Sequence, residues 1–240
     1  SQAIVGAILG WSLSTGQETD WIIVRRIAVA WVLAPLLGAL FAAGYYQLLK
    51  KWTRYSQIHL LQMDRWLRIL LLTAGILGAY SLGANNIANV MGVYTHAIDA
   101  GTVMLGEWQL FSTQQTLFLL GSCAITAGIY QFSHRVMRTV GHDIYQLTPS
   151  AALAVVLAGA TVLFLFASQS LEYYLTMAGL PTFLLVPVSQ SQTVVGAIVG
   201  IGLLRGGRSL NMTLLVKIVI GWIVTPLLSM ILAFLALNFL

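Results

Sequence analysis

The sequence predicts an all-α, polytopic membrane protein, and two observations predict it: an apolar composition and apolar runs long enough to cross a bilayer. Hydrophobic residues make up 58% of the 240 residues and charged residues 8%, whereas soluble chains are about one quarter charged. A helix needs roughly 20 apolar residues to cross a hydrocarbon core about 30 Å thick. Six such runs occur, at 27–49, 67–82 continuing into 83–97, 112–131, 149–168, 171–204 and 214–239.

The distribution of positive charge agrees with six crossings. Lys and Arg are spread over three connectors, which does not resemble the basic patch of a nucleic-acid-binding protein. These residues are Lys50, Lys51, Arg54, Arg65 and Arg68, then Arg135 and Arg138, then Arg205, Arg208 and Lys217. Connectors 99–107 and 169–181 contain none, so the positive-inside rule places them outside and the basic connectors in the cytoplasm. Arg25 and Arg26 do not fit this alternation. We expect a lipid bilayer as partner, in the inner (plasma) membrane of a prokaryote.

The chain also contains an internal repeat. Ser1–Gly10 resembles Ser191–Gly200, and the run around Pro35 resembles the run around Pro226. Repeated halves are typical of transporters, which move one half against the other around a central site. The loop after the first copy is acidic and the loop after the second is basic, so the copies are predicted to cross in opposite senses. The sequence therefore predicts an inverted repeat suited to alternating access.

The offset between the copies predicts the domain organisation. We expect 1–50 to be the end of the first inverted repeat, 51–66 a cytoplasmic connector and 67–240 the second inverted repeat. The first-repeat partner of the polar motif at 83–89 would fall before residue 1. We therefore expect the N-terminal half of repeat one as a partner, in the same chain or another, and a homodimer stays open.

The first polar motif is Gly83–Asn89 (GANNIAN), in the second predicted crossing. An unpaired amide at membrane depth costs on the order of a few kcal/mol. Helical spacing puts Asn85 and Asn89 on one face with Asn86 beside them, and Gly83 and Gly92 permit a break or a close backbone approach. Amide carbonyls can bind a cation, and amide NH₂ groups can donate to an oxyanion. Hydrogen bonding between helices is the alternative role.

The second polar motif is Pro187–Thr193 (PVSQSQT), in the fifth predicted crossing. Pro187 fits the start of a half-helix, whose free backbone N–H groups and positive dipole end attract an anion. Neutral hydroxyl and amide donors suit a tetrahedral oxyanion that must also be released. We assign the glycines that follow, at 196 and 200, to close helix packing.

Two other function classes compete with a carrier. A membrane enzyme is the main rival, but the predicted spans contain no His/Glu metal pair, no Ser–His–Asp set and no buried acid–base couple. We therefore expect no enzyme activity, no catalytic residue, no metal site and no cofactor. A channel stays open, because polar broken helices also line pores.

The two motifs together resemble those of the inorganic phosphate transporter (PiT) family, which includes sodium- or proton-coupled phosphate carriers and related sulfate permeases. The family signature looks like GANDxAN in one half-site and P-x-S followed by glycine in the other, here Gly83–Asn89 and Pro187–Gly196. The resemblance extends to the connector 141–149 and to the ending RGGRSLN…WIVTPLL. It implies an inverted-repeat transporter with broken (half) helices, which binds its anion and coupling ion near the membrane midplane.

Carried over by position, the resemblance assigns the anion to ten residues and the coupling ion to the three Asn among them. These are Asn85, Asn86, Asn89, Ser189, Gln190, Ser191, Gln192, Thr193, Ser1 and Gln2, of which the last two are first-repeat counterparts of Ser191 and Gln192.

Two departures from the family pattern affect the choice of ions. Asn86 stands where phosphate carriers usually have Asp, and Gln190-Ser191-Gln192 replaces Thr-Thr-His. Losing the carboxylate leaves Na⁺ and H⁺ both open as the coupling ion, and the Asn-Asn form looks closer to the sulfate permeases. We expect a secondary transporter of inorganic phosphate that works by ion-coupled alternating access, with a sulfate permease as the alternative and an anion channel more distant.

Overall fold

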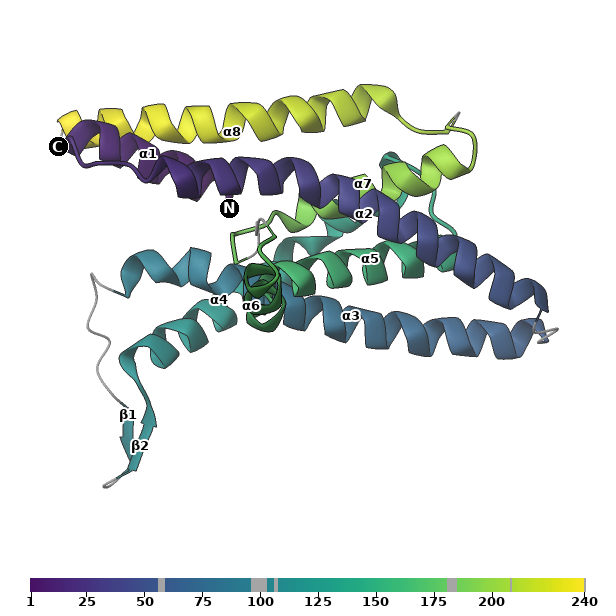
Figure 1. Cartoon of the computed structure of the whole chain (residues 1–240). Helices are drawn as coiled ribbons and strands as arrows, with labels where there is room; N and C mark the ends of the chain where they lie inside the picture. Colours follow the sequence, from purple (N-terminus) through teal and green to yellow (C-terminus); the bar gives the residue numbers. More distant parts are fainter. Residues whose placement is uncertain (56–58, 96–102, 106–107, 181–184, 208, 240) are drawn as a thin grey trace.

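The computed structural model describes residues 1–55, 59–95, 103–105, 108–180, 185–207 and 209–239 (Figure 1). The helices are α1 (Gln2–Thr15), α2 (Trp21–Tyr55), α3 (Leu60–Met91), α4 (Thr113–Arg138), α5 (Pro149–Ala167), α6 (Gln169–Met177), α7 (Gln190–Leu204) and α8 (Met212–Phe239). Short helical turns, η1 (Gly92–Tyr94) and η2 (Thr139–Asp143), follow α3 and α4. An antiparallel hairpin of β1 (Val103–Leu105) and β2 (Trp108–Phe111), which the sequence analysis did not predict, precedes α4.

Five helices are long and apolar enough to cross a membrane. They coincide with five of the six predicted crossings, so the predicted all-α membrane fold is confirmed. The remaining prediction, 171–204, contains two shorter helices, α6 and α7, with residues 185–189 outside any helix between them. At 1.5 Å per residue, the 15 residues of α7 extend only about 22 Å, so α7 is a half-helix.

The predicted break at Gly83 is wrong, because α3 runs without interruption from Leu60 to Met91. A glycine inside a helix costs only about 1 kcal/mol relative to alanine, which flanking helical residues readily offset. A side chain at Gly83 would meet nothing within 4 Å, so this glycine is not needed for a close approach either. The α-helix changes to a 3₁₀ turn only at Gly92.

The two copies of the internal repeat pack reciprocally. α1 lies along α8 and α2 lies along α7 (Figure 1). A side chain added at Gly6 would meet the backbone of Pro226, and one added at the equivalent Gly196 would meet the backbone of Pro35. The same holds one turn later for Gly10 with Met230 and for Gly200 with Ala39. In both pairs the residue numbers rise together, so the paired helices run parallel.

Equivalent helices of the two copies run in opposite directions. The chain reverses between α1 and α2 through Gly16, whose φ of 68° is a left-handed conformation that glycine adopts without strain. Ser12 Oγ donates to the carbonyl of Gln17 across this turn, at 2.7 Å. Because α2 is antiparallel to α1 and parallel to α7, α1 and α7 are antiparallel, as Figure 1 shows.

Among the five helices of membrane-spanning length, α5 is the best buried, and it packs against α2, α3 and α7. Small residues permit this, since Ala151, Ala154 and Ala158 are fully buried. Tyr45 on α2 and Thr161 on α5 hydrogen-bond through their hydroxyl groups, at 2.9 Å. This core holds α7 in place and thereby positions the polar residues at its N-terminal end.

Candidate functional site

Asn85 joins the two polar motifs. Its Oδ1 accepts a hydrogen bond from the backbone N–H of Val188, at 3.0 Å and buried. Asn85 is 9% exposed and Val188 is fully buried. The motif on α3 therefore lies directly against the segment that leads into α7.

Asn86, the next residue on α3, contacts the N-terminal end of α1. The hydroxyl of Ser1 donates to Asn86 Oδ1 at 3.3 Å. Neighbouring asparagines thus contact opposite copies of the repeat, Asn85 the second and Asn86 the first. Figure 1 shows the N-terminus close to the start of α7. The structure therefore brings together predicted ligands from α1, α3 and α7 that are far apart in sequence.

The segment 185–189 turns sharply into α7. Leu185 has φ of 56°, an uncommon left-handed conformation for a bulky residue, and its N–H donates to the carbonyl of Phe166 at 2.9 Å. α7 begins at Gln190 with Ser189 as its N-cap, so the prediction that Pro187 starts the helix is wrong by three residues. Pro187 instead holds the chain extended before the cap, because the residue before a proline disfavours helix and its own φ is fixed.

The N-terminal turn of α7 presents several free donors. The first backbone N–H groups of any helix have no acceptor within that helix, and they carry a partial positive charge. The Ser189 hydroxyl does not cap them, because it hydrogen-bonds to the Ser191 hydroxyl at 2.9 Å. The described side chains therefore leave this turn able to bind an anion.

Buried polar atoms without a hydrogen-bond partner gather on the predicted ligands. Within the described ranges, four of the five such side-chain atoms belong to residues that the sequence analysis singled out. They are Gln2 Nε2, Asn86 Nδ2, Gln190 Oε1 and Gln192 Oε1. Buried amides are normally paired, and leaving one open costs about 1–3 kcal/mol. A bound polar ligand would give these four atoms hydrogen-bond partners.

The fifth such atom, Nε1 of Trp31 on α2, was missed by the sequence analysis. The available signal was the repeat itself, because Trp31 begins the repeated run that contains Pro35. That run was used only to align the two copies.

Two predicted ligands have other roles or positions. Thr193 is fully buried, donates its hydroxyl proton to the carbonyl of Ser189 at 3.1 Å, and lies with its backbone against Gly38. Its position therefore serves helix packing between α7 and α2. Ser191 is exposed beside Ser189. The side chain of Asn89 lies outside the described residues.

The predicted ligands are all uncharged, which limits the chemistry of the site. Among the described residues, no group of three His, Cys, Asp or Glu side chains could hold a metal ion. Oxygen atoms of the amides, such as Gln190 Oε1 and Gln192 Oε1, could ligate a monovalent cation. The arrangement can bind an oxyanion and a small cation, and it offers no nucleophile activated by a base.

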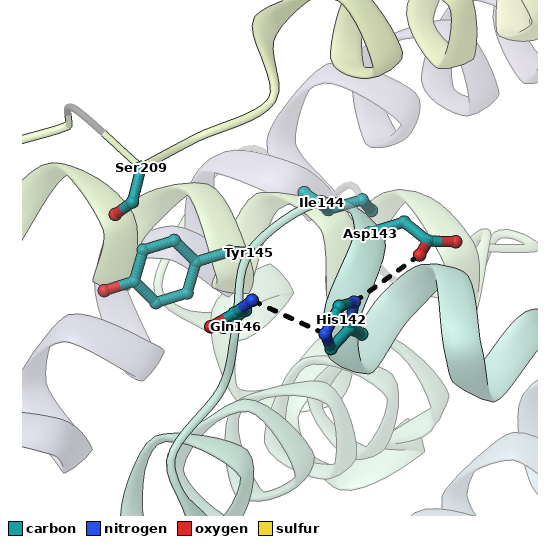
Figure 2. A pocket seen from close by; sticks show the side chains of 6 residues that line it. All are labelled: His142, Asp143, Ile144, Tyr145, Gln146 and Ser209. Carbon is teal, nitrogen blue, oxygen red and sulfur yellow. Dashed lines mark hydrogen bonds and ion pairs between the residues drawn. The ribbon is translucent and has the colours of Figure 1, made fainter.

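A cavity of about 470 Å³ lies away from these residues, at the connector between α4 and α5 (Figure 2). It is lined by His142, Asp143, Ile144, Tyr145, Gln146 and Ser209. Figure 2 shows Gln146 and Asp143 on either side of His142, at 3.4 Å and 3.7 Å. None of the predicted anion ligands lines this cavity. Beside it, Arg205 donates to the hydroxyls of Tyr46 and Tyr145, which fixes the C-terminal end of α7.

Comparison with known proteins identifies the family. The phosphate transporter family matches residues 1–233. The chain belongs to this family. The resemblance drawn from the two polar motifs is therefore confirmed.

Relatives and a solved structure agree with the phosphate transporter family. A "putative phosphate permease" of Methanocaldococcus jannaschii is 24% identical over 96% of this chain and 64% of its own length. Another of Haemophilus influenzae is 30% identical over 68% of this chain and 35% of its own length. A solved structure titled "The sodium-dependent phosphate transporter" has a TM-score of 0.53 and 20% identity, over 100% of this chain and 64% of that one. The chain thus spans about two thirds of the first of these relatives.

Membership of the phosphate transporter family, together with five apolar helices of membrane-spanning length, makes this an integral membrane protein. The solved structure agrees with the fold alone at its level of identity.

Proposed function

We propose that this protein is a secondary transporter that moves inorganic phosphate across the membrane by ion-coupled alternating access. The observation that supports it best is the meeting of Asn85, Asn86, Ser1 and the start of α7, where four predicted ligands keep buried polar atoms open. The two relatives described above both carry the name "putative phosphate permease", which agrees with this substrate.

The chemistry of the open atoms favours phosphate over sulfate. Gln2 Nε2 and Asn86 Nδ2 are donors, whereas Gln190 Oε1 and Gln192 Oε1 are acceptors. Near neutral pH, inorganic phosphate carries at least one P–O–H group, which donates a hydrogen bond, and sulfate carries none. A mixed set of donors and acceptors can therefore pair with both the oxygen atoms and the P–O–H group of phosphate, whereas sulfate has no donor to offer the acceptors.

Sodium is the coupling ion that we propose. The predicted ligands carry no charge, so a divalent anion would enter the bilayer with its charge uncompensated, which is costly. A cation that binds beside the anion removes that cost and couples the two movements. The amide oxygens of Asn86, Gln190 and Gln192 are ligands that Na⁺ accepts, and the structural neighbour is titled sodium-dependent.

The two copies of the repeat would work as an inverted pair. We assign 1–50 to the first repeat and 67–240 to the second, joined by the connector 51–66, into which α2 and α3 both extend. Reciprocal contacts of Gly6 with Pro226 and of Gly196 with Pro35 support this, as do the opposite directions of α1 and α7. Two equivalent but oppositely directed units around one site can exchange conformations, which opens the site to each side in turn. We place the transporter in the plasma membrane of a prokaryote.

The test is competitive uptake of labelled phosphate and labelled sulfate into proteoliposomes that contain the full chain, with and without sodium and pH gradients. We expect saturable phosphate uptake that needs a sodium gradient and that sulfate inhibits weakly. Sulfate uptake in preference to phosphate would reassign the substrate, and a proton gradient in place of sodium would reassign the coupling ion. Uptake that does not saturate and follows the membrane potential would indicate a channel.

A further inference from the structure

Trp31 on α2 is a buried donor without an acceptor. Its indole Nε1 is buried and has no hydrogen-bond partner among the described residues. A tryptophan N–H that is buried normally finds a partner, because leaving it open costs about 1–3 kcal/mol. Phenylalanine or leucine would fill this apolar position without that cost. The open N–H therefore needs a functional explanation.

Trp31 lies one helical turn before the contact between α2 and α7, toward the N-terminal end of α7. Pro35 meets Gly196, and Ala39 meets Gly200, in a parallel pair of helices. One turn before this contact on each helix come Trp31 and Gln192. Gln192 is 3% exposed and has its own open acceptor, Oε1. The two neighbouring turns thus offer one open donor and one open acceptor.

The residues around the Trp31 side chain also indicate that it lies near the start of α7. The side chain packs against the apolar cluster that contains Val186 and Val188, together with Val5 of α1. Val188 is the residue whose N–H binds Asn85, and Val5 lies one turn after Ser1, whose carbonyl accepts from its N–H at 3.1 Å. Side chains on a helix lean toward its N-terminus, which tilts the Trp31 indole toward the first turn of the parallel α7.

The repeat provides a built-in comparison. Trp222 on α8 is the counterpart of Trp31, and it stands four residues before Pro226 as Trp31 stands before Pro35. The indole nitrogen of Trp222 is not among the buried unpartnered atoms of the described residues. The Trp-x-x-x-Pro run therefore does not by itself produce a buried indole N–H without a partner. Among the described residues, this feature is found in the run on α2 and not in the run on α8.

We propose that the indole N–H of Trp31 donates a hydrogen bond to an oxygen of the oxyanion bound at the start of α7. This rests on the proposed function. The indole can only donate, so it suits an unprotonated oxygen of the anion, while the open acceptors of Gln190 and Gln192 face its protonated side or a cation. Trp31 would then help to fix the orientation of the anion.

Equilibrium binding of labelled inorganic phosphate to the purified full chain, in saturating sodium, tests this. Three proteins are compared with the parent: Trp31→Phe; the parent with Trp31 replaced by benzothienylalanine, which keeps the bicyclic shape but lacks the N–H; and Trp66→Phe. Trp66 is 51% exposed at the start of α3, so it controls for the loss of an indole. We expect Kd to rise about tenfold in both Trp31 variants, the value of one hydrogen bond to a charged group, and to stay unchanged in Trp66→Phe.

A second readout separates binding from helix packing. In the ¹H–¹⁵N spectrum of indole-labelled protein, the Trp31 signal is identified by its absence from Trp31→Phe, and we expect it to shift on adding phosphate. An unmoved signal, or a parent-like Kd for the benzothienylalanine protein, overturns the role of Trp31. If the parent itself binds no phosphate, the proposed function fails, which is a different result from a parent that binds and a variant that binds equally well.

Discussion

The helix pairs α1/α8 and α2/α7 share the same line of close glycine contacts, here called the seam, but they differ in what surrounds them. In each pair, a glycine of the short helix meets the backbone of a proline on the long one. In the first pair, the Ser229 hydroxyl donates to the carbonyl of Ala3. At the equivalent position in the second pair, Gly38 lies against the carbonyl of Thr193. α7 is enclosed because α5 covers it, whereas Leu215 is the one buried residue on the described part of α8. The repeat therefore encodes how two helices pair, and the rest of the chain decides how deeply each pair is buried.

The two helix pairs also differ in their contacts with the neighbouring asparagines of α3, Asn85 and Asn86. Asn85 holds the enclosed pair through a buried bond of 3.0 Å, whereas Asn86 meets α1 through a longer bond of 3.3 Å and keeps its amide nitrogen open. We therefore propose that these adjacent asparagines divide between a structural role, for Asn85, and a ligand-binding role, for Asn86. Four predictions break or sharpen the comparison.

Asn86→Leu should have the largest effect, reducing phosphate uptake to background. The change removes the open donor and the oxygen that faces Ser1, while no other described contact depends on this amide. Membrane insertion and thermal unfolding should match the parent. Asn238→Leu, near the end of α8, is the control and should keep full uptake. Parent-like uptake by Asn86→Leu would remove Asn86 from the site.

Gly196→Ala should lower the free energy of unfolding by about 3 kcal/mol, because its methyl group would overlap the backbone of Pro35 in an enclosed seam. Gly6→Ala makes the same overlap with Pro226, but the less enclosed α1 and α8 can separate, so its effect should be smaller. Thermal unfolding in detergent measures both. Gly44→Ala, which meets nothing within 4 Å, is the control. The opposite order for Gly6 and Gly196 would contradict the comparison.

Asn85→Leu should destabilise the protein by about 2 kcal/mol relative to Asn86→Leu, because it leaves the buried N–H of Val188 without an acceptor. The difference between the two melting temperatures measures this directly, since both variants make the same replacement at neighbouring positions. Equal melting temperatures would show that the two asparagines do not divide their roles as we infer.

Gln192→Ala should raise the Kd for phosphate about tenfold, equivalent to about 1.4 kcal/mol. Gln2→Ala, its first-repeat counterpart, should raise it less, because Gln2 is only partly buried whereas Gln192 is 3% exposed. Phosphate binding at saturating sodium measures both. A greater loss in Gln2→Ala would place the anion nearer to α1 than to α7.

Sequence reasoning succeeded where local pattern determines structure. Apolar runs of membrane-spanning length are set by the bilayer itself, so five long helices were found correctly. The repeat located the seams, since Gly6 and Gly196 stand at equivalent positions. The polar motifs marked residues that would be costly to bury alone, and the structure brings Asn85, Asn86 and the start of α7 together.

It failed where tertiary contacts override local preference. Gly83 suggested a break, but the neighbouring helical residues carry α3 straight through. Pro187 suggested a helix start, but the bond from Val188 to Asn85 keeps the chain extended until Ser189. Trp31 gave no local sign of its open N–H, because that depends on the register of α2 against α7.

The unequal lengths of the helices make the bilayer part of the mechanism. α2 and α3, with 35 and 32 residues, extend about 50 Å, whereas α1 and α7 extend about 22 Å and the hydrocarbon core about 30 Å. The long helices must tilt or project, which carries Lys50, Lys51 and Arg68 to the headgroups, where anionic lipids attract each charge by about 1 kcal/mol. We therefore expect acyl-chain length and anionic lipid content to change the depth at which the start of α7 lies in the bilayer.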